Sequence, residues 1–163
     1  MRRIRLGGPE DAAALAEIHV TTWQTAYRGM LGDSFLDSID SEPRRRWWDR
    51  HLKEGNPVHV AMDGGRVVGF CTAGASDEAG WGEVFAIYVL PSHWGRGLGH
   101  DLLSAGEETI RGLGLEQALL WVLERNERAR NFYEGHGWVL GRPVRVEDIG
   151  GTQVTELRYE KTL

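Results

Sequence analysis

The middle of the chain constrains the fold more than any other part of the sequence. Residues 84–89 form an apolar run that predicts a strand, and the glycine-rich segment 91–100 follows it directly. Residues 98–110 place apolar side chains at helical spacing, and residues 118–123 form a nearly continuous apolar run. A strand, a helix and a second buried strand in this order predict a parallel strand pair joined by a helical crossover.

The rest of the chain predicts antiparallel strands and further helices. Two β-rich runs, 58–62 and 67–73, surround an Asp-Gly-Gly turn, which is a strong hairpin signal, and strand 84–89 extends this hairpin into a meander. The remaining elements are expected as helices near residues 10–29, 42–52 and 127–134 and as strands near residues 3–6, 138–140 and 154–159. No linker divides the chain, so we expect one α+β domain over residues 1–163 with a mixed sheet.

Composition and charge argue against several classes of function. The formal net charge is -5 and long basic runs are absent, which argues against nucleic acid as a partner. No segment approaches the roughly 20 apolar residues of a membrane-spanning helix, and residues 1–7 are not followed by the apolar stretch of a signal peptide. Cys71 is the single cysteine and lies in an apolar run, where it is expected to act as a small hydrophobe. These features predict a cytoplasmic protein, and the spacing of the histidines predicts no metal site.

The segment Pro91-Ser92-His93-Trp94-Gly95-Arg96-Gly97-Leu98-Gly99-His100 predicts a site for a phosphate or diphosphate. Glycines permit a close approach of ligand to backbone, and the N-terminus of the following helix adds partial positive charge. A dinucleotide-binding motif has a similar layout, but its third glycine would fall at His100, and four extra residues, 91–94, separate strand and turn. A plain turn before a helix is the other explanation of these glycines.

Two motifs in this order resemble the GCN5-related N-acetyltransferase (GNAT) family. The family's coenzyme loop, Gln/Arg-x-x-Gly-x-Gly/Ala, follows a strand that ends in an apolar-Tyr-Val-x-Pro pattern. This sequence has that strand end at residues 87–91 and the loop at residues 94–99, with Trp94 where the family usually has Gln or Arg. Residues 126–138 are similar to the family block Asn-x-x-Ala-x-x-Phe-Tyr-x-x-x-Gly-aromatic. The resemblance covers residues 58–138 well and both ends loosely.

The resemblance implies a fold and a reaction. The fold has α/β/α layers, with a mixed, mostly antiparallel central sheet whose strands 84–89 and 119–122 splay apart to hold acetyl-CoA. The reaction transfers an acetyl group from acetyl-CoA to a primary amine of a small molecule, peptide or protein, by direct attack in a ternary complex. The expected coenzyme contacts are Ile87, Tyr88, Val89, Trp94, Gly95, Arg96, Gly97, Leu98, Gly99, His100 and Asn126. Asn126 is also suited to cap the helix that follows it.

Two residues are candidates for proton transfer. A free alkylamine, with a pKa near that of lysine at about 10.4, is mostly protonated at neutral pH, so a general base is useful. Glu83 lies at a strand position where some members of the family carry their base, although a solvated acid at the strand start is an equal alternative. Tyr133 matches the family's general acid, which protonates the departing thiolate, and a backbone N–H near Val89 is expected to stabilise the oxyanion.

The acceptor side is less specified by the sequence. His19, Trp23 and Tyr27 recur at helical spacing, and Trp23 and Tyr27 are candidate acceptor contacts, with core packing as the alternative. The expected partner is a small-molecule amine or a peptide, and the family analogy implies a homodimer. A catalytically silent acyl-CoA-binding or sensing module is the alternative function. The presence of both Tyr133 and Glu83 favours the enzyme.

Overall fold

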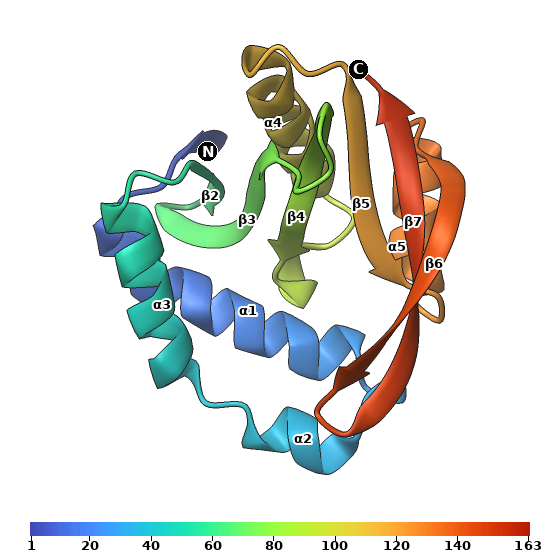
Figure 1. The fold of residues 1–163 in the computed structure, drawn as a ribbon. Coiled ribbons are helices and arrows are strands. Elements are labelled where there is room, and N and C mark those ends of the chain that lie inside the picture. The colour runs from blue at the N-terminus through green and yellow to red at the C-terminus, as the bar shows by residue number, and fades with distance from the viewer.

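A seven-stranded mixed sheet runs through the computed structural model of residues 1–163 (Figure 1). The strands are β1 (Arg2–Leu6), β2 (Val58–Asp63), β3 (Arg66–Ala75), β4 (Trp81–Val89), β5 (Gln117–Leu123), β6 (Val139–Ile149) and β7 (Thr152–Thr162). Their order in the sheet is β1-β2-β3-β4-β5-β7-β6. The helices are α1 (Ala12–Ala26), α2 (Asp33–Ser38), α3 (Ser41–Lys53), α4 (Leu98–Gly112) and α5 (Glu127–Gly135). Short 3₁₀ turns lie at Pro9–Asp11 and Pro91–His93.

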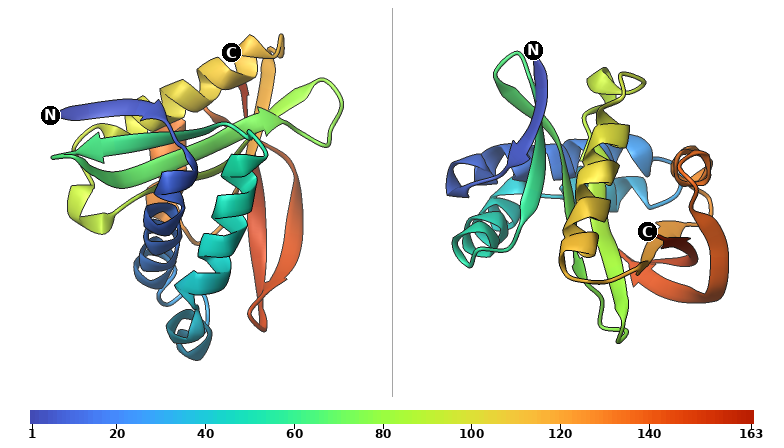
Figure 2. Two further views of the ribbon diagram at one scale, coloured as in Figure 1. Left: turned by 90° about the vertical axis from the view of Figure 1, so that its left-hand side faces the viewer. Right: turned by 90° about the horizontal axis from the view of Figure 1, so that it is seen from above.

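Helices cover both faces of the sheet and bury two separate cores. The left panel of Figure 2 shows α4 above the strands and α1 and α3 below them. A cluster of 16 buried residues joins α4 and α5 to one face, and a cluster of 10 joins α1 and α3 to the other. This arrangement confirms the predicted α+β fold with a mixed sheet between helices. None of the helices is both long enough and apolar enough to cross a membrane.

The parallel pair β4 and β5 opens the sheet. These strands are paired only from Trp81 to Glu83, opposite residues 117–119, whereas β5 pairs with β7 along its whole length. Beyond Glu83, β4 continues to pair with β3 alone. The expected splayed pair is therefore present, with its vertex at Glu83.

The C-terminal hairpin and α2 differ from the sequence predictions. Strands β6 and β7 have 11 residues each and are much longer than the expected segments 138–140 and 154–159. Helix α2 was not expected. The hairpin turn packs against this helix, because a Cβ atom on Gly150 would lie 2.2 Å from the ring of Phe35. Trp138 precedes β6, is buried, and donates its indole N–H to Glu107 Oε1 at 3.1 Å.

Cys71 belongs to the core under α4. Its side chain is fully buried, and a Cβ atom on Gly106 would lie 2.8 Å from its sulfur, so the helix approaches the strand closely there. Burial raises the pKa of the Cys71 thiol to about 12, with the charge of Glu107 adding to the rise. The thiol is protonated at neutral pH and packs as a small hydrophobe, as predicted.

Candidate active site

The glycine-rich segment forms a loop that ends in a helix N-terminus. Gly97 caps α4 with a φ of 82°, and Gly95 has a φ of 72°, both in the left-handed region that disfavours residues with a side chain. The first N–H groups of α4 lack helical partners and so suit an anion. Gly99 has a different reason for being glycine, since a Cβ atom there would lie 3.2 Å from the ring of Phe132 on α5.

A cleft of about 600 Å³ lies between this loop and α5. Its rim carries basic and titratable side chains, namely His93, Arg96, His100, Arg128 and His136. All of the predicted loop residues from Trp94 to His100 line it, together with Ile87 and Val89. The structure therefore brings these predicted coenzyme residues together in one cleft. Tyr88 and Asn126 lie outside it and line a second hollow described below.

Trp94 fixes the loop to β4. Its indole N–H donates to the carbonyl of Val89 at 2.7 Å, and the Arg128 guanidinium lies over its ring. The N–H of Leu90 donates to Val68 on β3, so the alternation of an antiparallel ladder turns the N–H and C=O of Val89 toward the gap. The Trp94 indole already binds the carbonyl, whereas the N–H of Val89 has no partner among the strands and is the free donor at this position.

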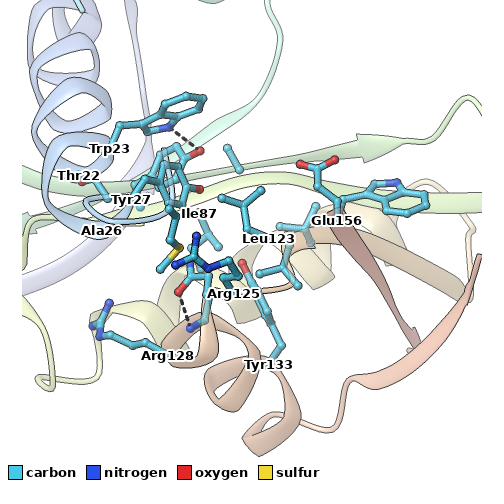
Figure 3. Close-up of a pocket in the computed structure, with 18 of the residues that line it drawn as sticks. Thr22, Trp23, Ala26, Tyr27, Ile87, Leu123, Arg125, Arg128, Tyr133 and Glu156 are labelled. Carbon is cyan, nitrogen blue, oxygen red and sulfur yellow. Dashed lines mark hydrogen bonds between the residues drawn. The ribbon is translucent and has the colours of Figure 1, made fainter. Parts of the chain in front are cut away.

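A second hollow of about 610 Å³ lies on the other side of the gap, between α1, β4, β5, α5 and the β6–β7 hairpin (Figure 3). The residues that line both hollows are Ile87, Val89, Trp94, Arg128, Ala129 and Tyr133. The two hollows therefore meet across the splayed strands. A long phosphate-bearing ligand in the first can present its end to a molecule in the second.

Tyr133 lies where the two hollows meet. Its side chain is 8% exposed, packs edge-on to Phe132 and Trp138, and directs its hydroxyl into the pocket (Figure 3). Burial raises the pKa of the Tyr133 hydroxyl far above its usual range. The hydroxyl is therefore protonated at neutral pH and is available as a donor.

Glu83 lies at the vertex of the splayed pair. It is half-buried within β4 and lines the second hollow, so it is neither a solvated acid at a strand start nor at an open edge of the sheet. Burial raises the pKa of its carboxyl, Asp77 adds to the rise, and the cations Arg145 and Arg158 oppose it. A carboxylate with a raised pKa is a stronger base than an exposed glutamate.

The aromatic stripe on α1 divides between pocket and core. Trp23 and Tyr27 line the second hollow, and the Trp23 indole donates to the Tyr88 hydroxyl at 3.0 Å. His19 is instead buried and stacks on Trp23 with ring centroids 5.3 Å apart. The stripe thus has two residues on the wall of the hollow and one in the core, and contact of Trp23 and Tyr27 with an acceptor stays a prediction.

His19 gives the fold a pH-dependent stability. Neither ring nitrogen has a hydrogen-bond partner, and burial, helped by the charge of Arg44, lowers the pKa of His19 from 6.5 to about 3. Between these values the unfolded chain binds more protons than the folded one, so stability falls as the pH drops below 6.5. From pH 7 to pH 5 this group lowers the free energy of unfolding by about 2 kcal/mol.

Replacing His19 should remove this pH dependence. We expect the free energy of unfolding of His19→Phe, measured in urea, to lose the decrease between pH 7 and pH 5, whereas His100→Gln should keep it. An equal pH dependence in wild type and His19→Phe would contradict this prediction.

Several residues of the second hollow were not predicted. Arg145 on β6 and Glu156 on β7 form an ion pair of 2.5 Å, and the Arg145 guanidinium lies over Trp121 on β5. Arg125 and Thr22 also line the hollow. A cross-strand pair of opposite charges was the available signal, but the register that places 145 opposite 156 follows a bulge that the sequence does not reveal.

Asn126 has a structural role that was predicted. Its Oδ1 accepts the N–H of Ala129 at 3.2 Å and so caps α5, and its side chain also lines the second hollow. No group of three or more His, Cys, Asp or Glu side chains is arranged to hold a metal ion.

The comparisons with known proteins agree with this geometry. The sequence matches the profile of the Acetyltransferase (GNAT) family over residues 14–138. It is 34% identical to the N-acetyltransferase YuaI of Bacillus subtilis, over 96% of this chain and 91% of that one. It is 26% identical to the L-amino acid N-acyltransferase MnaT of Escherichia coli, over 84% of this chain and 79% of that one. The fold superposes on the PaiA N-acetyltransferase of Thermoplasma acidophilum, solved with coenzyme A, with a TM-score of 0.76, 21% identity and coverage of 100% and 99%.

The fold and its two meeting hollows are the arrangement that a transferase needs to pass a group from one bound molecule to another. The chain belongs to the GNAT family of acetyltransferases. This assignment confirms the sequence prediction, and it favours an acetyl-transferring enzyme over the silent binding module.

Proposed function

We propose that this protein transfers an acetyl group from acetyl-CoA, bound in the cleft beside the α4 loop, to a primary amine in the second hollow. Acetyl-CoA as donor follows from the family assignment. The observation that carries the proposal is the position of Tyr133, which lines both hollows at the gap between β4 and β5. The loop from Trp94 to His100 holds the diphosphate, and the N–H of Val89 binds the pantetheine arm or the oxyanion.

Glu83 acts as the general base. The incoming amine loses a proton to its carboxylate, directly or through one water, and the amine nitrogen then attacks the thioester carbonyl. Both Glu83 and Tyr133 line the same hollow, which supports their assignment as base and acid of one reaction. The raised pKa of Glu83 makes its carboxylate better able to hold the proton.

Tyr133 assists the departing sulfur. When the tetrahedral intermediate collapses, the carbon–sulfur bond breaks and charge develops on the thiolate. The buried hydroxyl donates a hydrogen bond to this sulfur. The nitrogen loses its second proton as the amide forms, and one proton ends on the sulfur to give the free thiol of CoA, while the proton first taken by Glu83 passes to solvent. Because a thiol has a pKa of about 8.5, below that of the Tyr133 hydroxyl, hydrogen bonding to the developing thiolate carries more of the effect than an early proton transfer.

The acceptor is an amine small enough, or with a chain end narrow enough, to enter the second hollow. Trp23 and Tyr27 supply an aromatic wall. The charged side chains of this hollow are Glu83, Glu127, Glu156, Arg125, Arg128 and Arg145. Both positive and negative side chains line the hollow, so amino acids, polyamines and peptide N-termini are all candidate acceptors.

A thiol-release assay tests the proposed function. The wild-type protein is mixed with acetyl-CoA and a panel of amines, CoA is detected by its free thiol, and the acetylated product is identified by its mass. We expect one or more amines to raise CoA release well above the rate with acetyl-CoA alone. Tight binding of acetyl-CoA with no acceptor-dependent release across the panel would instead support the silent module.

The assembly and location are part of the same proposal. Strand β6 is an edge of the sheet and exposes Val139, Leu140, Val144 and Val146, so it is the surface on which a second copy would pack in a homodimer. Light scattering coupled to size exclusion measures this state directly. A cytoplasmic location fits a chain whose single cysteine, Cys71, is a buried free thiol.

A further inference from the structure

Two histidines meet at the coenzyme cleft. His100 lies in the first turn of α4 and His136 ends α5, and both line the cleft beside the loop. His136 Nε2 lies 3.0 Å from His100 Nδ1, and His136 Nδ1 lies 2.7 Å from the carbonyl oxygen of Phe132. His100 was expected from the sequence as a coenzyme contact, whereas no role was expected for His136.

The hydrogen-bond partners limit where protons can sit on this pair. A carbonyl oxygen only accepts, so His136 Nδ1 carries a hydrogen. In the neutral pair His136 Nε2 then has no hydrogen and accepts through its lone pair. The single ring N–H of His100 is therefore on Nδ1, which donates to His136 Nε2. His100 Nε2 is left as an acceptor, which repels an anion.

Adding one proton changes the outer nitrogen of the pair. If His100 takes the proton, His100 Nε2 carries it. If His136 holds the charge, its Nε2 donates to His100 Nδ1, and the hydrogen of His100 again moves to Nε2. Both forms of the singly charged pair therefore present an N–H donor at His100 Nε2, with the positive charge either on His100 itself or on the neighbouring His136. A further proton would place two hydrogens in the 3.0 Å contact, so the pair takes up one proton and no more.

The position of His100 at the start of α4 makes protonation of the pair depend on whether a phosphate is bound. His100 lies at the N-terminus of α4, where the helix dipole opposes a cation in the free protein and where a bound anion reverses that penalty. The other titratable and charged groups that line the cleft are His93, Arg96, Arg128 and Tyr133. Asp101 and Glu134 lie close to the pair in sequence, and Lys161 lies beside Gly137. Some of these are already engaged: Arg128 lies on Trp94, Glu134 accepts from Tyr159, and Lys161 binds Glu107. These charges are present before and after binding, whereas the phosphate arrives with the ligand.

We propose that the His100–His136 pair binds a phosphate group of the coenzyme by taking up one shared proton, so that coenzyme affinity weakens as the pH rises. The inference rests on the proposed function, because it places the coenzyme phosphates in this cleft. It adds a second residue, His136, which positions His100 and shares its charge. Imidazoles change charge between about pH 5 and 8, so the coupling acts in the physiological range.

Calorimetry with CoA itself, without acceptor, tests the coupling. Binding to the wild-type protein at pH 7.5 is measured in buffers of different ionisation enthalpy, and the dissociation constant is followed from pH 6.5 to 8.5. We expect net proton uptake approaching one per CoA and a dissociation constant that rises by up to about tenfold per pH unit. The phosphate monoester of CoA, with a second pKa of about 6, could only release a proton on meeting a cation, so it cannot produce uptake.

Three variants identify the source of the proton. His100→Gln keeps an N–H donor near the Nε2 position but has nothing to titrate, so CoA binding should become independent of pH with no proton uptake. His136→Asn keeps the donor to Phe132 and removes the shared contact, so uptake should decrease. His51→Gln, on α3 across the sheet, should behave as wild type.

The outcomes are distinguishable. Proton uptake that persists in His100→Gln would assign the titration to another group, such as His93, and would overturn the inference. A wild-type dissociation constant that does not change with pH would overturn it as well, while CoA binding itself would leave the proposed function intact. If wild type failed to bind CoA at any pH, the proposed function would fall, and this inference with it.

Discussion

Phenylalanine in place of Tyr133 is expected to lower kcat by about 10²- to 10³-fold, the range typical of a lost hydrogen-bond donor to a developing negative charge. The substitution removes one oxygen and leaves the ring, which packs against Phe132 and Trp138 in the core. The fold and the coenzyme cleft should therefore persist, and the dissociation constant for acetyl-CoA should be nearly unchanged. Steady-state kinetics with the identified acceptor and calorimetry with acetyl-CoA measure the two quantities.

Tyr159→Phe is the matched control for this change. The Tyr159 hydroxyl donates to Glu134 and accepts from Arg130, and it lines neither hollow. Its removal should reduce stability and leave kcat close to wild type. If Tyr133→Phe retained full turnover, or if it lost turnover only by losing acetyl-CoA binding, Tyr133 would not be the donor to the sulfur.

Glu83→Gln should cause the second large loss, about 10²-fold or more in kcat/KM near neutral pH. The amide has nearly the shape of the carboxylate but cannot accept the proton of the amine. With wild type, the acidic limb of kcat/KM should lie above the range of an exposed glutamate, because burial raises the pKa of Glu83 and only its deprotonated form is active. Activity therefore rises with pH through this limb.

The pH profile separates a base from a structural acid. In Glu83→Gln this limb should disappear, and activity should keep rising toward the pKa of the acceptor amine, about 10, as the neutral amine accumulates without help. Asp77→Asn serves as the control, since Asp77 only adds to the rise in the pKa of Glu83 and its removal should shift the limb slightly to lower pH. An unchanged profile in Glu83→Gln would show that another group or water takes the proton.

The elements nearest the coenzyme were predictable because their signals are local. The apolar run 84–89, the glycines at 95 and 97 and the helix from Leu98 each depend on neighbours a few positions away, and the structure contains all three. The resemblance added the splay of β4 and β5, which neither composition nor periodicity would reveal. Glu83 was expected on this strand, but its half-burial could not be predicted, since it depends on how β5 meets β4.

The features that were not predicted depend on contacts distant in sequence. Helix α2 has only six residues, and it packs against the turn at Gly150, which lies more than a hundred residues later in the sequence. Strand β6 has few buried side chains, so no alternation marks its 11 residues. The contact between His100 and His136 likewise joins two helices that the sequence keeps 36 positions apart.

The open V between β4 and β5 leaves one edge of β4 without a neighbouring strand. Beyond Glu83 the inner edge of β4 offers backbone groups, such as the N–H of Val89, that no strand of the chain completes. Under the proposed function the pantetheine arm would bind along this edge, and a ligand that binds only the folded state at a hundred times its dissociation constant adds about 2.7 kcal/mol to stability. Occupancy of this edge by the coenzyme would therefore raise the free energy of unfolding of the whole fold, in proportion to the logarithm of the coenzyme concentration.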